Sequence, residues 1–370
     1  MAMSLGRLLP PWFASLVPYQ PGKPIEEVER EYGIRDSIKL ASNENPLGPS
    51  PKAMAALAAA IPGVHRYPDG GCYYLKQRLA KQLDVSPERV FFGNGSNEIL
   101  ELLARLFLRP GDDALMSEQA FIVYPSVVQA CAGISRAVPL RDFTHDLDAI
   151  LDAVRPSTRL VFLGNPNNPT GTIFRRAELE RFFKRLRADV VVACDEAYFE
   201  YVDDPEYPDS LRYQDGSRLL VTIRTFSKIY GLAGLRIGYA IGPAEFVAAL
   251  DRIRQPFNVS SLAQAAALAA LDDDEHVERS RRINSDGKRW LVAELGSLGL
   301  EHVPTQANFI LVNVGDGAAI TEALVRRGVI VRPMVIYGFP GFVRVTIGTE
   351  AENRRFIDSL RGVLDRSGIA

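Results

Sequence analysis

Short apolar runs alternate with longer amphipathic stretches through the middle of the chain. The runs have the length and β-branched content of buried strands, and they fall at residues 90–92, 115–116, 138, 160–163, 190–194, 219–223 and 239–241. Between several of them apolar residues recur every three or four positions, as at Ile99, Leu102, Leu103 and Leu106, which predicts helices. This alternation indicates an α/β protein with a mostly parallel sheet covered by helices.

The pattern changes beyond residues 251–258, where Pro256 interrupts the periodicity. Residues 260–271 predict an alanine-rich helix, residues 275–298 a long amphipathic helix, and residues 350–364 a closing helix. Strands are predicted at residues 309–312, 329–331 and 343–347. The second pattern indicates a smaller α+β domain.

Three polar segments each follow a predicted strand. They are residues 165–171 (NPNNPTG), 195–198 (DEAY) and 225–236 (TFSKIYGLAGLR). Taken singly, each also fits a plain role as a turn, a helix cap or a solvated surface charge. The carboxyl ends of parallel strands, however, meet where α/β proteins bind their ligands. We therefore expect an amide, a carboxylate with a phenol, and a lysine to converge on one small molecule. A lysine in such a place forms Schiff bases with carbonyl compounds, pyridoxal phosphate among them.

Composition narrows the possible classes. The chain has 370 residues, of which 47% are hydrophobic and 24% charged, and its net charge is −2. No long basic block is present, so a nucleic acid is not an expected partner. Cys72, Cys131 and Cys194 form no spaced pair and only four histidines occur, so we expect reduced thiols in a cytoplasmic protein without a metal site.

The apolar stretch at residues 8–17 lies where a signal peptide would lie. Pro10 and Pro11 interrupt it and only Arg7 precedes it, so it lacks the continuous apolar run of a secretory signal. We interpret it as an arm that packs on the body or on a partner. No stretch approaches the roughly 20 apolar residues of a membrane helix, so no membrane is expected as a partner.

The order and the sequences of the three polar segments resemble those of fold-type I pyridoxal-phosphate enzymes, the aspartate aminotransferase superfamily. Within it the chain is most similar to histidinol-phosphate aminotransferases. The resemblance runs from residues 18–24 (PYQPGKP) and 40–48 (LASNENPLG) through 67–69 (YPD) to 344–349 (RVTIGT). The lysine segment identifies the superfamily, while residues 43–46 and 67–69 point to the subfamily.

The resemblance implies a domain arrangement and a dimer. A large α/β domain at residues 46–256 would hold a mostly parallel, seven-stranded type of sheet between helices. Residues 1–45 and 257–370 would form an N-terminal arm and a small α+β domain, with the N-terminal residues folded onto the latter. Tyr67 matches a tyrosine that reaches the cofactor phosphate from the neighbouring subunit, which implies a homodimer with shared sites.

The implied cofactor is pyridoxal 5′-phosphate, and its phosphate needs N–H groups and positive charge. The turn at residues 93–95 opens a helix with Ser96 as N-cap, so the amides of Ser96 and Asn97 are candidates for holding the phosphate. Thr225, Ser227 and Arg236 match family positions that donate to the same phosphate, and the planar fork of Arg236 suits it.

The resemblance assigns the other cofactor contacts to residues of the polar segments. Asp195 would pair with the ring nitrogen, Tyr198 and Asn168 would bind the ring hydroxyl, and Phe121 would stack on the ring. Lys228 would carry the cofactor as a Schiff base and move the proton from the substrate α-carbon. The catalytic residues expected are therefore Lys228, Asp195 and Tyr198.

Substrate choice is expected to depend on arginines. Arg344 alternates with apolar residues along a predicted strand and so stands apart from the buried side. In the family this arginine binds the α-carboxylate, and the phosphate ester of histidinol phosphate hangs from the same position. Arg332 matches a second arginine that helps with the doubly charged phosphate. Tyr19, near the imidazole end, and Asn45 complete the implied substrate site.

The implied reaction moves an amino group from L-histidinol phosphate to 2-oxoglutarate in ping-pong fashion, giving imidazole acetol phosphate and glutamate in histidine biosynthesis. An aromatic amino acid aminotransferase remains an alternative, because Arg344 would accept its carboxylate equally well. A phosphothreonine-type decarboxylase shares the fold and the lysine segment. A cofactor-binding regulatory module is disfavoured, because Lys228 and Asp195 are both retained and no basic DNA-binding extension is seen.

Overall fold

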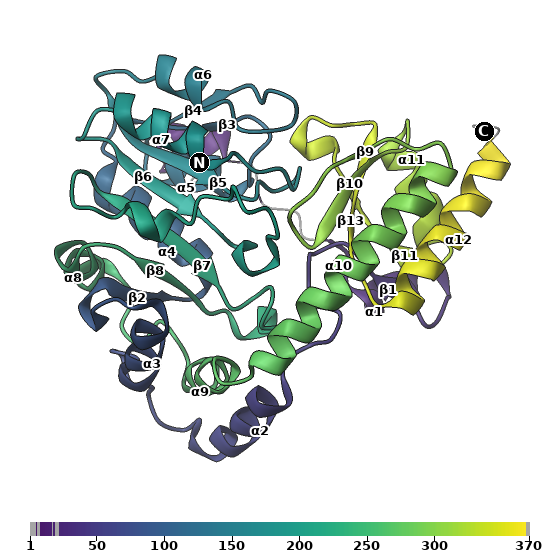
Figure 1. Ribbon diagram of the computed structural model, residues 1–370, viewed down its shortest axis with the longest axis horizontal. Helices are drawn as coiled ribbons and strands as arrows, with labels where there is room; N and C mark the ends of the chain where they lie inside the picture. The colour runs from purple at the N-terminus through teal and green to yellow at the C-terminus, as the bar shows by residue number, and fades with distance from the viewer. Residues whose placement is uncertain (1–4, 6–7, 17, 19–21, 368–370) are drawn as a thin grey trace.

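The computed structural model describes residues 5, 8–16, 18 and 22–367, and a large sheet between helices dominates it (Figure 1). Within the described residues, seven strands form this sheet. β8 runs antiparallel to both of its neighbours, and every other pair is parallel. The α/β fold with a mostly parallel sheet is therefore confirmed. The strand order is β2 (Val90–Gly93), β8 (Gly238–Ile241), β7 (Leu220–Thr225), β6 (Val191–Asp195), β5 (Thr158–Gly164), β3 (Asp113–Ser117) and β4 (Ile134–Val138).

Both faces of the large sheet are buried, because successive side chains along a strand point to opposite sides. In β5, Leu160 and Phe162 pack with α4 (Gly95–Phe107), α5 (Val123–Ala130) and α8 (Ala244–Ile253). Val161 and Leu163 pack instead with α6 (Leu147–Asp152) and α7 (Arg176–Arg185). This alternation explains why the strands read as continuous apolar runs.

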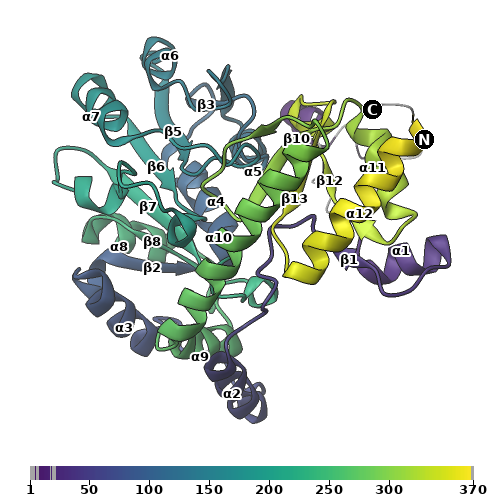
Figure 2. The ribbon, with the colours of Figure 1, turned by 45° about the vertical axis from the view of Figure 1, so that its right-hand side comes forward.

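A further helical layer lies at the β2 edge of the sheet. It consists of α2 (Pro51–Ala60), α3 (Tyr73–Leu83) and α9 (Ser261–Ala270), and α9 contacts both of the others. The long helix α10 (Asp274–Ser297) then runs from this layer to the smaller part of the molecule (Figures 1 and 2). Because α9 lies with the large sheet, we propose a domain boundary near residue 273 in place of residue 256.

The smaller part contains an antiparallel sheet of β12 (Arg332–Pro333), β13 (Phe342–Thr346), β10 (Phe309–Asn313) and β9 (His302–Val303). Helices α10, α11 (Gly317–Val325) and α12 (Glu350–Ser367) cover it. The strand predicted at residues 329–331 is divided, since β11 (Val329–Ile330) pairs in parallel with β1 (Ile38–Lys39) and β12 joins the antiparallel sheet.

The N-terminal region does not lie in one place. Helix α1 (Ile25–Tyr32) and β1 lie with the smaller part, as expected for the arm. The 3₁₀ turn η2 (Pro11–Ser15) contacts α5 beside the large sheet instead. An apolar turn reduces its exposed area against any apolar helix face within reach, and α5 is such a helix. The other short turns are η3 (Ile61–Gly63), η4 (Pro87–Arg89), η5 (Phe199–Tyr201), η6 (Ser210–Tyr213), η7 (Ala233–Leu235) and η8 (Val335–Tyr337).

Among the described residues, no helix combines the length and the apolar character required to cross a membrane.

Candidate active site

A cavity of about 180 Å³ lies at the carboxyl ends of β5, β6 and β7. The start of α4 and strands β12 and β13 of the small sheet also contribute side chains to it. Most of the expected site residues line this cavity, namely Ser96, Asn97, Phe121, Asn168, Asp195, Tyr198, Thr225, Ser227, Lys228, Arg236, Arg332 and Arg344.

Three expected site residues are not placed there. Tyr19 falls outside the described residues. Tyr67 is 84% exposed and its ring stacks on Phe257 at 4.8 Å, so it serves no site within its own chain. The Asn45 side chain points elsewhere, because its amide donates to the Ile229 carbonyl at 2.7 Å and to Ser280 Oγ at 2.9 Å. The expectation that Asn45 contacts substrate is therefore revised.

Sequence reasoning missed Asn43, Tyr124 and Tyr337, which all line the cavity. Asn43 lies in the same NENP segment as Asn45, and its positive φ of 56° turns the backbone there. Tyr124 follows Phe121 by three residues at the start of α5. That helical spacing was the signal that could have found it, since residues three apart share a helix face.

The junction of β2 and α4 forms a cradle for an anion. Helix α4 begins at Gly95 with Asn94 as N-cap, so Ser96 lies inside the first turn and the expected N-cap is wrong. Gly95 has a φ of +72°, and a Cβ there would lie 2.4 Å from Nη2 of Arg236. Only glycine lets the guanidinium approach the helix start so closely. The free N–H groups of the first turn and this charge together suit a phosphate.

Hydroxyl groups flank the same guanidinium. Nη1 of Arg236 lies 3.4 Å from Ser227 Oγ, and the Ser227 N–H donates to Thr225 Oγ1 at 3.1 Å. Thr225 is the last residue of β7 and Ser227 follows it by two residues, while Arg236 precedes β8, which is paired with β7. The strand pairing thus brings an arginine and two hydroxyls to one side of the cavity.

Asp195 lies at the end of β6 and is 6% exposed. Its Oδ2 accepts a hydrogen bond from the Tyr124 hydroxyl at 3.0 Å, while Oδ1 is buried and has no hydrogen-bond partner in the described part of the chain. Burial raises the pKa of this carboxyl to about 6, against the lowering effect of Tyr124. A buried acceptor without a partner calls for a donor from a ligand, and a protonated ring nitrogen fits it.

Lys228 faces the cavity from the segment after β7. Its Nζ donates to the Ser42 carbonyl at 3.2 Å and lies 5.7 Å from the centre of the Tyr198 ring. Burial, assisted by the positive charge of Arg344, lowers the pKa of this amine to about 8. About a tenth of the amine is therefore uncharged at pH 7, far more than for an ordinary lysine, and an uncharged amine is the form that attacks a carbonyl.

Two further pairs fix the polar side chains between the two sheets. The Asn43 amide donates to the Tyr198 hydroxyl at 2.8 Å, and burial raises the pKa of that phenol, which keeps its proton. On the other side, Nη1 of Arg344 donates to Asn168 Oδ1. Tyr198 and Asn168 are thus both held by other side chains of the protein, which favours a defined ligand orientation.

Arg332 and Arg344 lie opposite each other on the antiparallel strands β12 and β13. Both are buried and both line the cavity. Val343 and Val345 point the other way into the small core, which agrees with the alternation read from the sequence. Nη2 of Arg344 donates to the Ala41 carbonyl at 3.0 Å, so its orientation is fixed. Two paired cations at one wall favour a ligand with more than one negative charge.

The residues together fit a flat carbonyl compound that carries a phosphate and a basic ring nitrogen. The cradle at Gly95 and Arg236 takes the phosphate, the unpartnered Oδ1 of Asp195 takes the nitrogen, and Phe121 lies at the wall. Lys228 supplies the amine for the carbonyl. The two paired arginines remain for a second, anionic molecule.

Comparison with known proteins agrees with this chemistry. Residues 35–360 match the family model of aminotransferase class I and II. The histidinol-phosphate aminotransferase of Moorella thermoacetica is 51% identical over 352 residues, which cover 95% of this chain and 91% of that protein. Histidinol-phosphate aminotransferase 2 of Pseudomonas aeruginosa is 49% identical over 96% of this chain and 98% of its own length.

Solved structures show the same fold. The crystal structure of histidinol-phosphate aminotransferase from Sinorhizobium meliloti in complex with pyridoxal-5′-phosphate matches with a TM-score of 0.84 and 28% identity, covering 96% of this chain and 98% of that one. An aspartate aminotransferase from Thermus thermophilus with maleate has a TM-score of 0.82 at 24% identity, covering 96% of this chain and 99% of that one, and indicates the fold alone.

Proposed function

The chain belongs to the aminotransferase class I and II family, and from this premise we propose that it is a pyridoxal-phosphate-dependent histidinol-phosphate aminotransferase. It transfers the amino group of L-histidinol phosphate to 2-oxoglutarate and serves histidine biosynthesis. The observation that carries the substrate is the cross-strand pair of Arg332 and Arg344 at the cavity wall. A phosphate dianion gains from both charges, and a carboxylate can still use one.

The residues that line the cavity support this choice of cofactor. Bound pyridoxal phosphate supplies a carbonyl for amine exchange and a ring that accepts electrons. The first turn of α4 and Arg236 would bind its phosphate, and Asp195 Oδ1 would accept the ring N–H. Tyr198 and Asn168 would orient the ring hydroxyl, and Phe121, which also lines the cavity, would lie against the ring.

Lys228 performs the proton transfer. Its Nζ is the group that would hold the cofactor carbonyl, and the free amine would take the proton of the substrate α-carbon. A pKa of about 8 keeps the amine able to accept this proton near neutral pH. A positioned base of this kind contributes about 10² to 10⁴-fold in rate. Burial of the site limits the access of water to the reacting carbon.

An aromatic amino acid aminotransferase is the second candidate. Its support is the ring-rich wall of the cavity, where Phe121 and Tyr337 both lie, together with Arg344 for the carboxylate. The two candidates differ in their use of Arg332. Measuring kcat/KM for histidinol phosphate and for phenylalanine, each with 2-oxoglutarate, tests the proposal. A preference for phenylalanine would overturn histidinol phosphate as the main substrate.

We also propose that the working unit is a homodimer in the cytoplasm. Exposed apolar and aromatic side chains gather on the segments around α2, α3 and the loop before α9, namely Met54, Ile61, Val64, Tyr67, Tyr73, Tyr74 and Phe257. Such a patch is typical of a protein interface, and Tyr67 within it would reach the partner's cofactor phosphate. The three cysteines are free thiols, as in a reducing compartment.

A further inference from the structure

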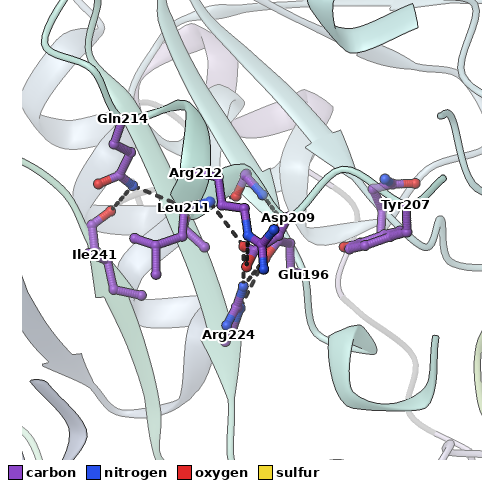
Figure 3. A network of polar contacts seen from close by, with 11 residues as sticks. Glu196, Tyr207, Asp209, Leu211, Arg212, Gln214, Arg224 and Ile241 are labelled. Atoms are coloured by element: carbon purple, nitrogen blue, oxygen red, sulfur yellow. Dashed lines mark hydrogen bonds and ion pairs between the residues drawn. The ribbon is translucent and has the colours of Figure 1, made fainter. Parts of the chain in front are cut away.

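Arg224, near the end of β7, is a buried cation that lies beside Glu196 and Asp209 (Figure 3). The side chain of Arg224 is 3% exposed. Its Nη2 lies 2.8 Å from Glu196 Oε2 and 2.7 Å from Asp209 Oδ1, and its Nε also donates to Glu196 at 2.9 Å. The guanidinium additionally stacks over the Phe199 ring at 3.5 Å.

Two partners of Arg224 are sequence neighbours of cavity residues. Glu196 directly follows Asp195, and Phe199 directly follows Tyr198. Arg224 itself directly precedes Thr225. In each of these neighbouring pairs one residue lines the cavity and the other belongs to the cluster around Arg224. A single guanidinium thus links the segment that carries Thr225 to the segment that carries Asp195 and Tyr198.

The buried carboxylate of Glu196 needs the positive charge of Arg224 beside it. Its side chain is 1% exposed, and apart from Arg224 it accepts a hydrogen bond from the Ser210 N–H at 2.9 Å. A buried carboxylate without its cation must take up a proton or move toward water. Either change would disturb the backbone that carries Asp195, and an uncompensated charge would oppose ionisation of Asp195 as well.

We propose that Arg224 is a positioning residue for the cofactor site. It neutralises the charge of Glu196, and this pairing keeps the adjacent Asp195 side chain directed toward the cavity. The inference rests on the proposed pyridoxal-phosphate site. Neither Arg224 nor Glu196 lines the cavity, so neither contacts the cofactor or the substrate. The effect of Arg224 on the site is therefore indirect.

The test separates charge compensation from general stability. The dissociation constant of pyridoxal phosphate is measured by intrinsic fluorescence, and unfolding of the cofactor-free protein is followed in urea. The variants are Arg224→Met and the double variant Arg224→Met with Glu196→Gln. The matched control is Arg218→Met, because Arg218 is half-buried and stacks on Phe183, but it donates to the backbone carbonyls of Phe183 and Leu186 at the end of α7.

We expect Arg224→Met to weaken cofactor binding at least about tenfold, since it leaves a buried charge unpaired. The double variant should recover affinity to within about threefold, because removal of both partners of a buried pair costs far less than removal of one. Arg218→Met should lower stability and leave the dissociation constant within about twofold. The proposal would be overturned if Arg224→Met bound the cofactor as tightly as the wild type. It would also be overturned if the double variant bound the cofactor no more tightly than Arg224→Met.

Arg224→Lys keeps the test decisive if Arg224→Met does not fold. Lysine retains the charge, although it lacks the planar fork, so affinity should stay within about threefold of wild type. A tenfold loss in Arg224→Lys would show that charge is not the cause and would refute the inference. Failure of the unmodified protein to bind pyridoxal phosphate would instead refute the proposed function.

Discussion

The hydroxyl of Tyr124 donates a hydrogen bond to Oδ2 of Asp195 across 3.0 Å. The bond joins α5 to the end of β6, and it leaves Oδ1 as the oxygen that faces a ligand. Tyr124 is itself held by a parallel stack on Phe162 of β5, with ring centres 4.9 Å apart. The orientation of the carboxylate is therefore set by a rigid neighbour before the cofactor binds.

Tyr124→Phe should make cofactor binding more sensitive to acid. The lost hydrogen bond lowers the pKa of Asp195 in the native protein, so its removal raises that pKa above about 6. The ring nitrogen needs the ionised carboxylate. The affinity of Tyr124→Phe for the cofactor should therefore be lower than that of the unmodified protein at about pH 6 to 7, and nearly the same above about pH 8. Phenylalanine keeps the stack on Phe162, which serves as an internal control. An unchanged pH dependence of the dissociation constant would contradict this role.

Lys228 is expected to react with the cofactor carbonyl more quickly as the pH rises through about 8, the pKa of its buried amine. Stopped-flow mixing of cofactor-free protein with pyridoxal phosphate measures this rate. Borohydride should then fix the cofactor on the peptide that contains Lys228, and Lys228→Ala should remove both signals. Labelling of a different lysine in the intact protein would show that the assignment is wrong.

Glu200 should destabilise the fold above neutral pH. It is buried, its Oε2 has no hydrogen-bond partner among the described residues, and burial raises its pKa from 4.5 to about 7. Below pH 4.5 the carboxyl is protonated in both states and has no effect. Between pH 4.5 and 7 the folded state binds more protons, so stability falls as the pH rises. Glu200→Gln should thus stabilise the protein by about 3 kcal/mol at pH 8 and hardly at pH 4, as urea unfolding would measure.

The local sequence was enough to predict the mostly parallel sheet and to predict that Lys228 and Asp195 lie at one cavity. Asp195 ends one strand and Lys228 lies three residues after another, and a strand end fixes where such residues lie. Tyr124 and Asn43 were missed because their roles come from contacts across different elements, between α5 and β6 and between residue 43 and Tyr198. The pattern within one segment does not record such contacts.

The placement of Asn45 and of α9 could not be predicted for a similar reason. The alternative partners of the Asn45 amide, Ile229 and Ser280, lie 184 and 235 residues away along the chain. Helix α9 is alanine-rich on most of its surface, so its sequence does not say which neighbour it meets; the structure places it against α2, which is also alanine-rich. Small side chains allow both helices a close approach.

The dimer should depend on the exposed aromatic stack of Tyr67 and Phe257. Phe257→Asp would place a charge in an apolar interface and should shift light scattering toward the monomer, with loss of activity at the same protein concentration. Ile134→Asp is a suitable control, since Ile134 is an exposed apolar residue on β4, at the opposite edge of the sheet from β2. A fully active monomer in the unmodified protein would refute the shared site.

The paired arginines allow the sharpest test of the substrate. Because Arg332 and Arg344 face each other across β12 and β13, a phosphate dianion can bind both, while a carboxylate is satisfied by Arg344 alone. Charge-assisted hydrogen bonds contribute about 1.5 to 3 kcal/mol each, or roughly ten- to a hundredfold in binding. Arg332→Ala should lower kcat/KM for histidinol phosphate by that factor and affect phenylalanine much less.

Arg344→Ala should lower kcat/KM for both substrates, because both anions need it and because Asn168 loses the guanidinium that orients its amide. The comparison of the two variants separates substrate choice from general damage to the site. Equal losses on both substrates in Arg332→Ala would remove Arg332 as the discriminating residue. The histidinol-phosphate reaction would then depend on Arg344 and on the groups that meet the imidazole.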